Sequence, residues 1–173
     1  MSRYFGPALQ NGYLIRDLDA AVEHWTQVLG IGPFFVIESV QMVEPQYRGK
    51  PLELDMSIAL ANSGDLQIEL IRQNCDTPSI YREWLARDQL GLHHLGYFVD
   101  DIEAAMAQVP GGARYVQHGR TAGGGAFAYI ETEAHPGTYA ELIRCDDGMR
   151  GMFDMIRQAS TDWDGSDPVR KLG

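Results

Sequence analysis

Four side chains that could bind a divalent cation stand at matching places in the two halves of this chain: Gln10, Glu69, His94 and Glu141. His94 follows Gln10 by 84 residues, and Glu141 follows Glu69 by 72. The two glutamates lie in apolar stretches, where an ionised carboxylate is costly unless a positive charge compensates it. Two carboxylates, one imidazole and one amide oxygen are donors that a divalent cation accepts. The pattern predicts a shared metal site, provided that both halves fold alike.

Two pairs of matching segments indicate that the halves do fold alike. Residues 12–21 (GYLIRDLDAA) align with residues 96–105 (GYFVDDIEAA), with five of ten positions identical. Residues 69–72 and 141–144 both read ELIR. The matches occur in the same order, which indicates a duplicated unit, and the smaller offset of the second match gives the first copy longer loops.

Each copy predicts the element order βαβββ. The opening strand leads to an aspartate, Asp17 or Asp101, that is placed to cap a helix. Apolar runs bounded by turn residues predict the strands, with turns at 62–65 and 135–137. The predicted strands are 10–15, 33–39, 53–62 and 66–72 in the first copy, and 94–99, 113–118, 126–132 and 138–144 in the second. We therefore expect an α+β fold in which two tandem βαβββ modules form a curved, cup-shaped mixed sheet.

We expect one domain over residues 1–173. Its parts are a first module at 8–74, a second module at 92–146, and a C-terminal helix and tail at 147–173. Apolar stripes predict further helices after Pro78 and around 149–156, each with its apolar side in the core. The segment 160–173 is polar with Gly and Pro, which predicts a loosely held tail.

Composition argues against several classes of partner. A formal net charge of −10 disfavours nucleic acid and anionic membrane surfaces. No apolar stretch is long enough to cross a bilayer, and no signal peptide is visible. Two cysteines suggest reduced thiols rather than a disulfide framework. We expect a cytoplasmic protein whose partner is a small-molecule substrate, with no nucleic acid and no membrane partner.

In the order and spacing of its motifs, the chain resembles the vicinal oxygen chelate superfamily over residues of about 8–146. That superfamily includes glyoxalase I, methylmalonyl-CoA epimerase, extradiol dioxygenases and bleomycin-resistance proteins. The resemblance implies a glyoxalase-like fold with Gln10, Glu69, His94 and Glu141 as metal ligands, similar to the zinc ligands of eukaryotic-type glyoxalase I. The motifs are Gln10-x-Gly12, Asp17-Leu18-Asp19-Ala20-Ala21, Val28-Leu29-Gly30, Glu69-Leu70, His93-His94 and Glu141-Leu142.

The resemblance implies a metal-dependent isomerase, epimerase or lyase that transfers a proton beside a carbonyl. A bound Zn, Ni, Co or Mn ion would stabilise the enediolate, while Glu141, beside Glu69, would loosen from the metal and move the proton. The substrate stays open. Glyoxalase I holds glutathione with an arginine and an asparagine where this chain has Leu14 and Gln73.

Two other functions compete with this one. A non-catalytic, antibiotic-sequestering type of binding protein would use tyrosine and tryptophan around an acidic cavity to hold cationic aromatic compounds. An extradiol-type dioxygenase is disfavoured because it needs histidine at both opening strands, and Gln10 takes one of these places. A homodimer is expected, and the site could form within one chain or across that dimer.

The remaining candidates are secondary. Strand alternation predicts that His93 faces away from His94, and His24 is expected on the exposed side of a helix. His118 and His135 are candidates for the mouth of the cavity. Residues 123–125, three glycines, are interpreted as a mobile loop between strands. Arg48 and Lys50 are candidate phosphate contacts for a CoA thioester.

Overall fold

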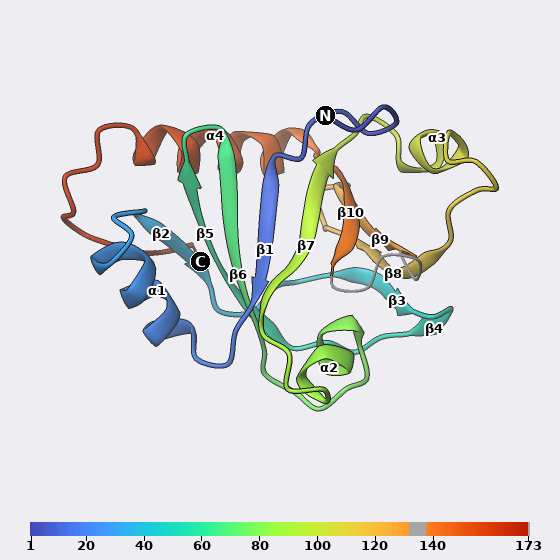
Figure 1. Ribbon diagram of the computed structural model, residues 1–173, viewed down its shortest axis with the longest axis horizontal. Coiled ribbons are helices and arrows are strands. Elements are labelled where there is room, and N and C mark those ends of the chain that lie inside the picture. The colour runs from blue at the N-terminus through green and yellow to red at the C-terminus, as the bar shows by residue number, and fades with distance from the viewer. Residues whose placement is uncertain (132–137, 173) are drawn as a thin grey trace.

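The two predicted modules are joined in one curved, unclosed mixed sheet (Figure 1). The computed structural model describes residues 1–131 and 138–172. The first module contributes β1 (Gln10–Leu14), β2 (Phe34–Ile37), β5 (Met56–Ser63) and β6 (Leu66–Gln73). The second contributes β7 (Gly91–Phe98), β8 (Tyr115–Arg120), β9 (Ala126–Ile130) and β10 (Tyr139–Arg144). The predicted fold class is confirmed.

Strand order shows that the modules repeat one arrangement. It runs β2-β5-β6-β1 in the first module and β8-β9-β10-β7 in the second. In each module the opening strand pairs parallel with the last one, β1 with β6 and β7 with β10. The opening strands β1 and β7 pair antiparallel with each other at the centre of the sheet (Figure 1). Residues far apart in sequence are therefore neighbours at this junction.

The outer face of each module is covered by the helix that follows its opening strand. Asp17 caps α1 (Leu18–Gln27) by accepting from the Ala20 amide at 3.0 Å. Asp101 caps α3 (Ile102–Ala107) in the same way, at 2.7 Å from the Ala104 amide. Each helix buries its apolar side in a separate cluster with its own module's strands. The predicted caps account for where both helices begin.

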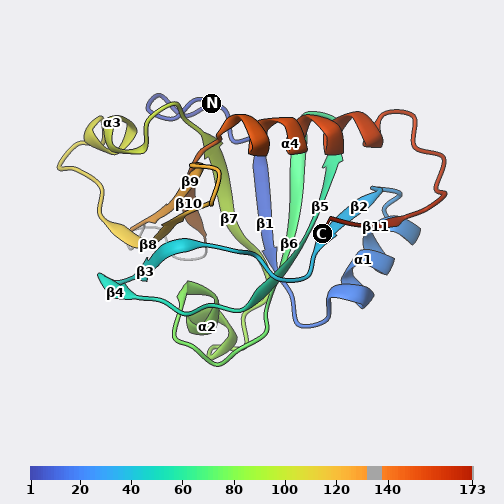
Figure 2. The same cartoon turned by 180° about the vertical axis from the view of Figure 1, so that it is seen from behind.

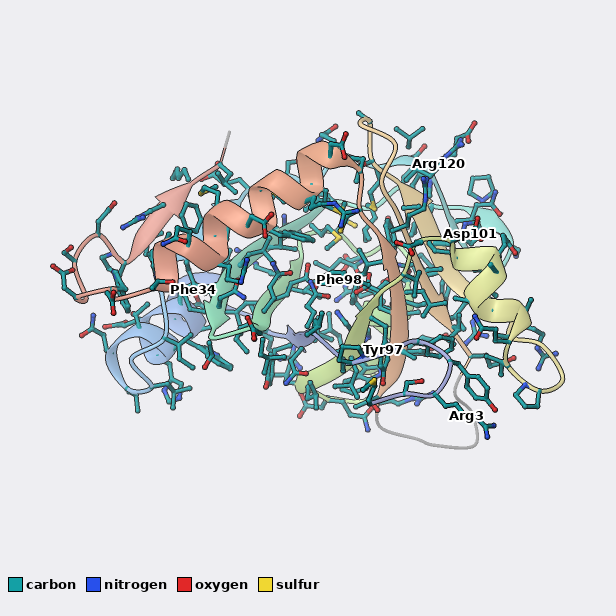
Figure 3. All side chains as sticks on the ribbon, turned by 90° about the horizontal axis from the view of Figure 1, so that it is seen from above. Arg3, Phe34, Tyr97, Phe98, Asp101 and Arg120 are labelled. Atoms are coloured by element: carbon teal, nitrogen blue, oxygen red, sulfur yellow. The ribbon has the colours of Figure 1, made fainter. Side chains whose placement is uncertain are left out.

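The inner face carries the largest apolar cluster, which draws on both modules. Two helices pack against it: α2 (Ile80–Leu85), between the modules, and α4 (Asp147–Ser160), which crosses β5, β6 and β1 near one end (Figure 2). The ring of Phe98, labelled in Figure 3, lies 5.7 Å from that of Phe153 on α4. The inner face is thus closed over by α4 along one side.

Three short strands extend the sheet beyond the predicted elements. The long loop of the first module forms β3 (Val43–Tyr47) and β4 (Lys50–Pro51), and β3 pairs with β8 of the second module. The tail forms β11 (Val169–Lys171), which pairs parallel with β2. The prediction of a loosely held tail was therefore wrong. Edge pairing of this kind depends on a distant partner strand and leaves no local pattern in the sequence.

The turn predicted at 135–137 lies outside the described residues. Within the described ranges, no helix combines the length and the apolar character needed to cross a bilayer.

Candidate metal centre

Two rows of residues cross the middle of the sheet side by side. The first row follows the strand register from β5 to β7 and reads Leu60, Glu69, Gly12, His94. The second runs from β1 to β9 and reads Gln10, Gly96, Glu141, Tyr129. Residues two apart in a strand point to one face, so both rows share the inner face. All four predicted ligand residues are in these rows, and all come from one chain.

The glycine in each row makes room for a side chain of the other opening strand. A Cβ built on Gly12 would lie 1.8 Å from Cε1 of His94, and one on Gly96 would lie 2.7 Å from Oε1 of Gln10. The imidazole of His94, on β7, therefore extends over β1 towards Glu69, which is on β6 at the far side of β1. Neighbouring strands are roughly 4.8 Å apart, so a side chain in between would block this approach.

The donor atoms of Glu141, Glu69 and Gln10 converge on Nε2 of His94, the fourth predicted donor. That atom is 3.0 Å from Oε2 of Glu141, 3.3 Å from Oε2 of Glu69 and 3.4 Å from Oε1 of Gln10. One donor atom from each of the two glutamates and His94 lies within 4.8 Å of the others. His94 is 0% exposed, and the glutamate side chains are 12% and 7% exposed. Such donors, buried and convergent, fit a divalent cation.

Gln67, which sequence reasoning missed, orients one of the donors. Its Oε1 accepts a hydrogen bond from Nε2 of Gln10 at 2.8 Å. Because the amide nitrogen of Gln10 is engaged there, its oxygen faces His94. Gln67 is 3% exposed and stands two residues before Glu69 on the same face. A glutamine alternating with a glutamate in an apolar strand was the available signal.

The prediction for His93 was wrong, because this residue turns to the same side as His94. The register between β1 and β7 shifts at this point, pairing Gly12 with His94 but Tyr13 with Leu92, so His93 is an extra residue in the ladder. Its Nδ1 lies 3.2 Å from Nδ1 of His94. A bulge of this kind breaks the alternation on which the prediction rested.

Charge in the centre is balanced by His94. Burial alone would lower the pKa of its imidazole, but the carboxylates of Glu141 and Glu69 outweigh burial and raise it to about 9. The pKa of Glu69 is raised, first by burial and also by the charge of Glu141, while His94 opposes the shift. A proton on His94 thus compensates the carboxylates in the absence of a metal. A divalent cation would supply that positive charge directly.

Two tyrosines, also missed from the sequence, border the same centre. The hydroxyls of Tyr81 and Tyr129 are 2.9 Å apart and buried. Burial, with further contributions from the two glutamates, raises both pKa values well above 10. Both hydroxyls therefore stay protonated and can act as hydrogen-bond donors.

A cavity of about 240 Å³ opens beside the donors, bordered by Gln10, Glu69 and Glu141 at one end and by both tyrosines. The other sequence candidates lie elsewhere. The ring of His118 contacts that of Tyr115 in a tilted arrangement, with centroids 4.5 Å apart, beside a separate surface pocket. His24 is exposed on α1, as expected. His135 lies outside the described residues.

Three other sequence candidates lie outside the described cavity lining. Arg48 pairs with Glu83 at 2.8 Å, and Lys50 is an exposed residue of β4. The glycine loop at 123–125 is held by Asp146, the N-cap of α4, which accepts from the Gly125 amide at 2.6 Å. The loop lies between two strands, β8 and β9, as interpreted, and its mobility stays a prediction.

Comparisons with known proteins agree with this architecture. The family model described as Glyoxalase/Bleomycin resistance protein/Dioxygenase superfamily matches residues 9–129, a stretch that includes Gln10, Glu69 and His94. No curated protein matches the chain.

Several solved structures share the fold. A hypothetical protein from Bacillus halodurans C-125 superposes with a TM-score of 0.58 at 16% identity, covering 82% of this chain and 95% of that one. Methylmalonyl-CoA epimerase from Mycobacterium tuberculosis gives 0.57 at 18% identity, with 82% and 89% covered. The Streptomyces coelicolor epimerase, in complex with 2-nitronate-propionyl-CoA, gives 0.53 at 19% identity, with 82% and 95% covered.

At these identities the solved structures establish the fold alone, whereas the family match spans most of both modules. This chain belongs to the Glyoxalase/Bleomycin resistance protein/Dioxygenase superfamily.

Proposed function

We propose that the protein is a divalent-metal-dependent isomerase, epimerase or lyase that transfers a proton beside a carbonyl group. The observation that carries this proposal is the convergence of two buried carboxylates, an imidazole and an amide oxygen at one end of a cavity. Gln10, Glu69, His94 and Glu141 would hold the metal. A bound Zn, Ni, Co or Mn ion would act as a Lewis acid on the negative charge that develops when the proton leaves.

Proton transfer is assigned to the carboxylate pair. Glu141 is the proposed group that takes up and returns the proton, and Glu69 is its partner. Both border the cavity, and burial beside a like charge raises the pKa of Glu69. A general base works best when its pKa lies near the operating pH, and the raised pKa of Glu69 moves that carboxyl group in this direction.

The two tyrosine hydroxyls would orient the substrate. Their mutual hydrogen bond uses one of the two available protons, so the other is free to donate to a substrate oxygen. Tyr129 lies next to Glu141 across the β9–β10 ladder, which places this donor on the side of the proposed base.

Substitution of the glutamates tests the proposal. Glu141→Gln and Glu69→Gln should each slow exchange of the substrate α-proton in deuterated water by about 100-fold or more, because an amide cannot take up the proton. The screen would cover 2-oxo adducts and acyl-CoA thioesters with metal-loaded protein. Glu23→Gln is the matched control, because that side chain is exposed on α1, which covers the outer face, and is not among the described lining residues. Wild-type exchange by both variants with metal bound would contradict the mechanism.

A non-catalytic binding protein remains the second candidate. The observation in its favour is the aromatic wall of the cavity, formed by Tyr81, Phe127, Tyr129 and Phe153. Such a protein would bind its ligand with equal affinity after metal removal by EDTA. The enzyme proposed above requires that affinity to fall.

A further inference from the structure

We propose that the substrate group held in this cavity is uncharged and hydrophobic, which assigns to the site an apolar carbonyl compound rather than one with a second, anionic group. This inference rests on the proposed function and names its substrate class. It follows from the composition of the cavity wall, the distribution of charge around it, and its volume.

The wall away from the metal donors is mainly apolar, and besides the tyrosines its polar members in the described lining are Gln41 and Thr121. Branched aliphatic residues of β2 and β5 form one side, and methionines with Phe153 of α4 form the other. The principal members are Ile37, Ile58, Leu60, Met149, Met152 and Phe153. A ligand group that displaces water from such a wall gains affinity in proportion to its apolar surface.

Charge in the cavity is confined to the metal end, and it is negative. Within residues 1–131 and 138–172, none of the residues that line the cavity is a lysine or an arginine. A carboxylate on the distal part of a substrate would lose its hydration without gaining a counter-charge, which is expensive. Glu69 and Glu141 are the only charged residues in the described lining, so no side chain there offers such an anion a counter-charge.

Cationic side chains do border an adjoining pocket that shares Ile143 and Phe153 with the cavity. Arg150 and Arg157 border that pocket, but so do three aspartates, Asp65, Asp100 and Asp154. Arg157 already pairs with two of them, at 3.6 Å and 3.4 Å. The adjoining pocket therefore offers an anion no clear excess of positive charge.

The volume of the cavity limits the size of the substrate group that it can hold. Its volume of about 240 Å³ is below the roughly 300–1,000 Å³ of sites that hold drug-sized ligands. Four of its lining residues are methionines, whose unbranched side chains adapt to different apolar shapes. A small aromatic or branched aliphatic ketone fits this description.

A matched pair of α-hydroxyketones tests the inference. One is α-hydroxyacetophenone with a para-isopropyl group, and the other has a para-carboxylate, which has the same number of heavy atoms. Both present the same two vicinal oxygens to the metal, so only the distal group differs. With zinc-loaded protein, calorimetry should show the isopropyl compound binding at least about 30-fold more tightly.

A new cation in the wall should change this preference. Met152→Lys places an ammonium group among the lining residues. The ratio of the affinity for the isopropyl compound to that for the carboxylate should fall by about tenfold or reverse. Met155→Lys is the matched control, since Met155 is on the same helix but is 41% exposed and outside the described lining. This control should keep the wild-type ratio.

The outcomes separate the inference from the proposed function. Equal or tighter binding of the carboxylate by the wild-type protein would overturn the inference while leaving the metal centre intact. Failure of both ketones to bind zinc-loaded protein would overturn it as well. A protein that binds no metal would defeat the proposed function itself, and the zinc titration reports this before either ketone is added.

Discussion

The two modules share a backbone plan, yet they bring different chemistry to the inner face. Each contributes a donor from its opening strand, a glutamate from its last strand and a glycine that gives the other module's donor room. The opening-strand donor is a neutral amide in the first module, Gln10, and a titrating imidazole in the second, His94. Beside Glu69 the first module has Leu60, and beside Glu141 the second has Tyr129.

The symmetry of the backbone and the asymmetry of the site therefore have separate origins. The strand register alone puts the paired donors on one face and next to each other. The side chains at equivalent places then differ. The second module contributes the titrating ring of His94 and the hydroxyl of Tyr129, whereas the first contributes the amide of Gln10 and the apolar side chain of Leu60. Three experiments test this difference between the modules.

Filling the glycine places should have the largest effect. In Gly12→Ala the new Cβ would overlap the buried ring of His94, so metal affinity should fall by about 100-fold or more. In Gly96→Ala the Cβ would meet the more flexible Gln10, at 2.7 Å from Oε1, and the loss should be smaller. Metal-dependent change in melting temperature measures both.

Gly151→Ala controls for the loss of a glycine, because a Cβ there would meet no atom within 4 Å. It should bind metal like the wild type and melt at the same or a higher temperature, since alanine favours a helix. If Gly12→Ala bound metal as tightly as the wild type, His94 could not be a metal ligand in the position where it crosses β1.

The second-largest effect should be the pH dependence of the stability of the metal-free protein, because only the second module contributes a titrating donor. The pKa of His94 rises from 6.5 to about 9 on folding, so its stabilisation is complete below pH 6.5 and is lost as pH rises through 9. The melting temperature should fall over this range, by on the order of 5 °C. Added metal should reverse the trend, because it requires the neutral imidazole.

His94→Gln isolates this effect by giving the second module the amide of the first. In this variant the melting temperature should change much less between pH 6.5 and 9 than it does in the wild type. If its melting temperature falls with pH as steeply as that of the wild type, groups other than His94 govern the loss of stability at alkaline pH.

The smallest effect should come from the neighbours of the two opening-strand donors. Gln67 lies beside Gln10 in the ladder, as Tyr139 lies beside His94. Gln67→Leu removes the acceptor that orients the Gln10 amide, so metal affinity should fall by roughly tenfold. Tyr139→Phe should leave it unchanged, because the Tyr139 hydroxyl donates to Glu83 instead. Calorimetric metal titration of both variants tests this, and equal losses would contradict the proposed role of Gln67.

Much of the fold could be predicted because its signals are local. The duplicated segments, the capping residues Asp17 and Asp101, and the apolar runs each act through neighbours in sequence. The repeat offsets also marked Gln10, Glu69, His94 and Glu141 as equivalent pairs. Their convergence followed from one assumption, that equivalent strands occupy equivalent places in the sheet.

Spacing along the chain encodes the duplicated βαβββ plan and the pairing of Gln10 with His94 and of Glu69 with Glu141. Spacing could not reveal that His93 turns inward at a bulge, that Gln67 fixes the amide of Gln10, or that the tail becomes β11. Each of these depends on pairing between strands distant in sequence. Such pairing is set by packing across the whole sheet rather than by local residue preference.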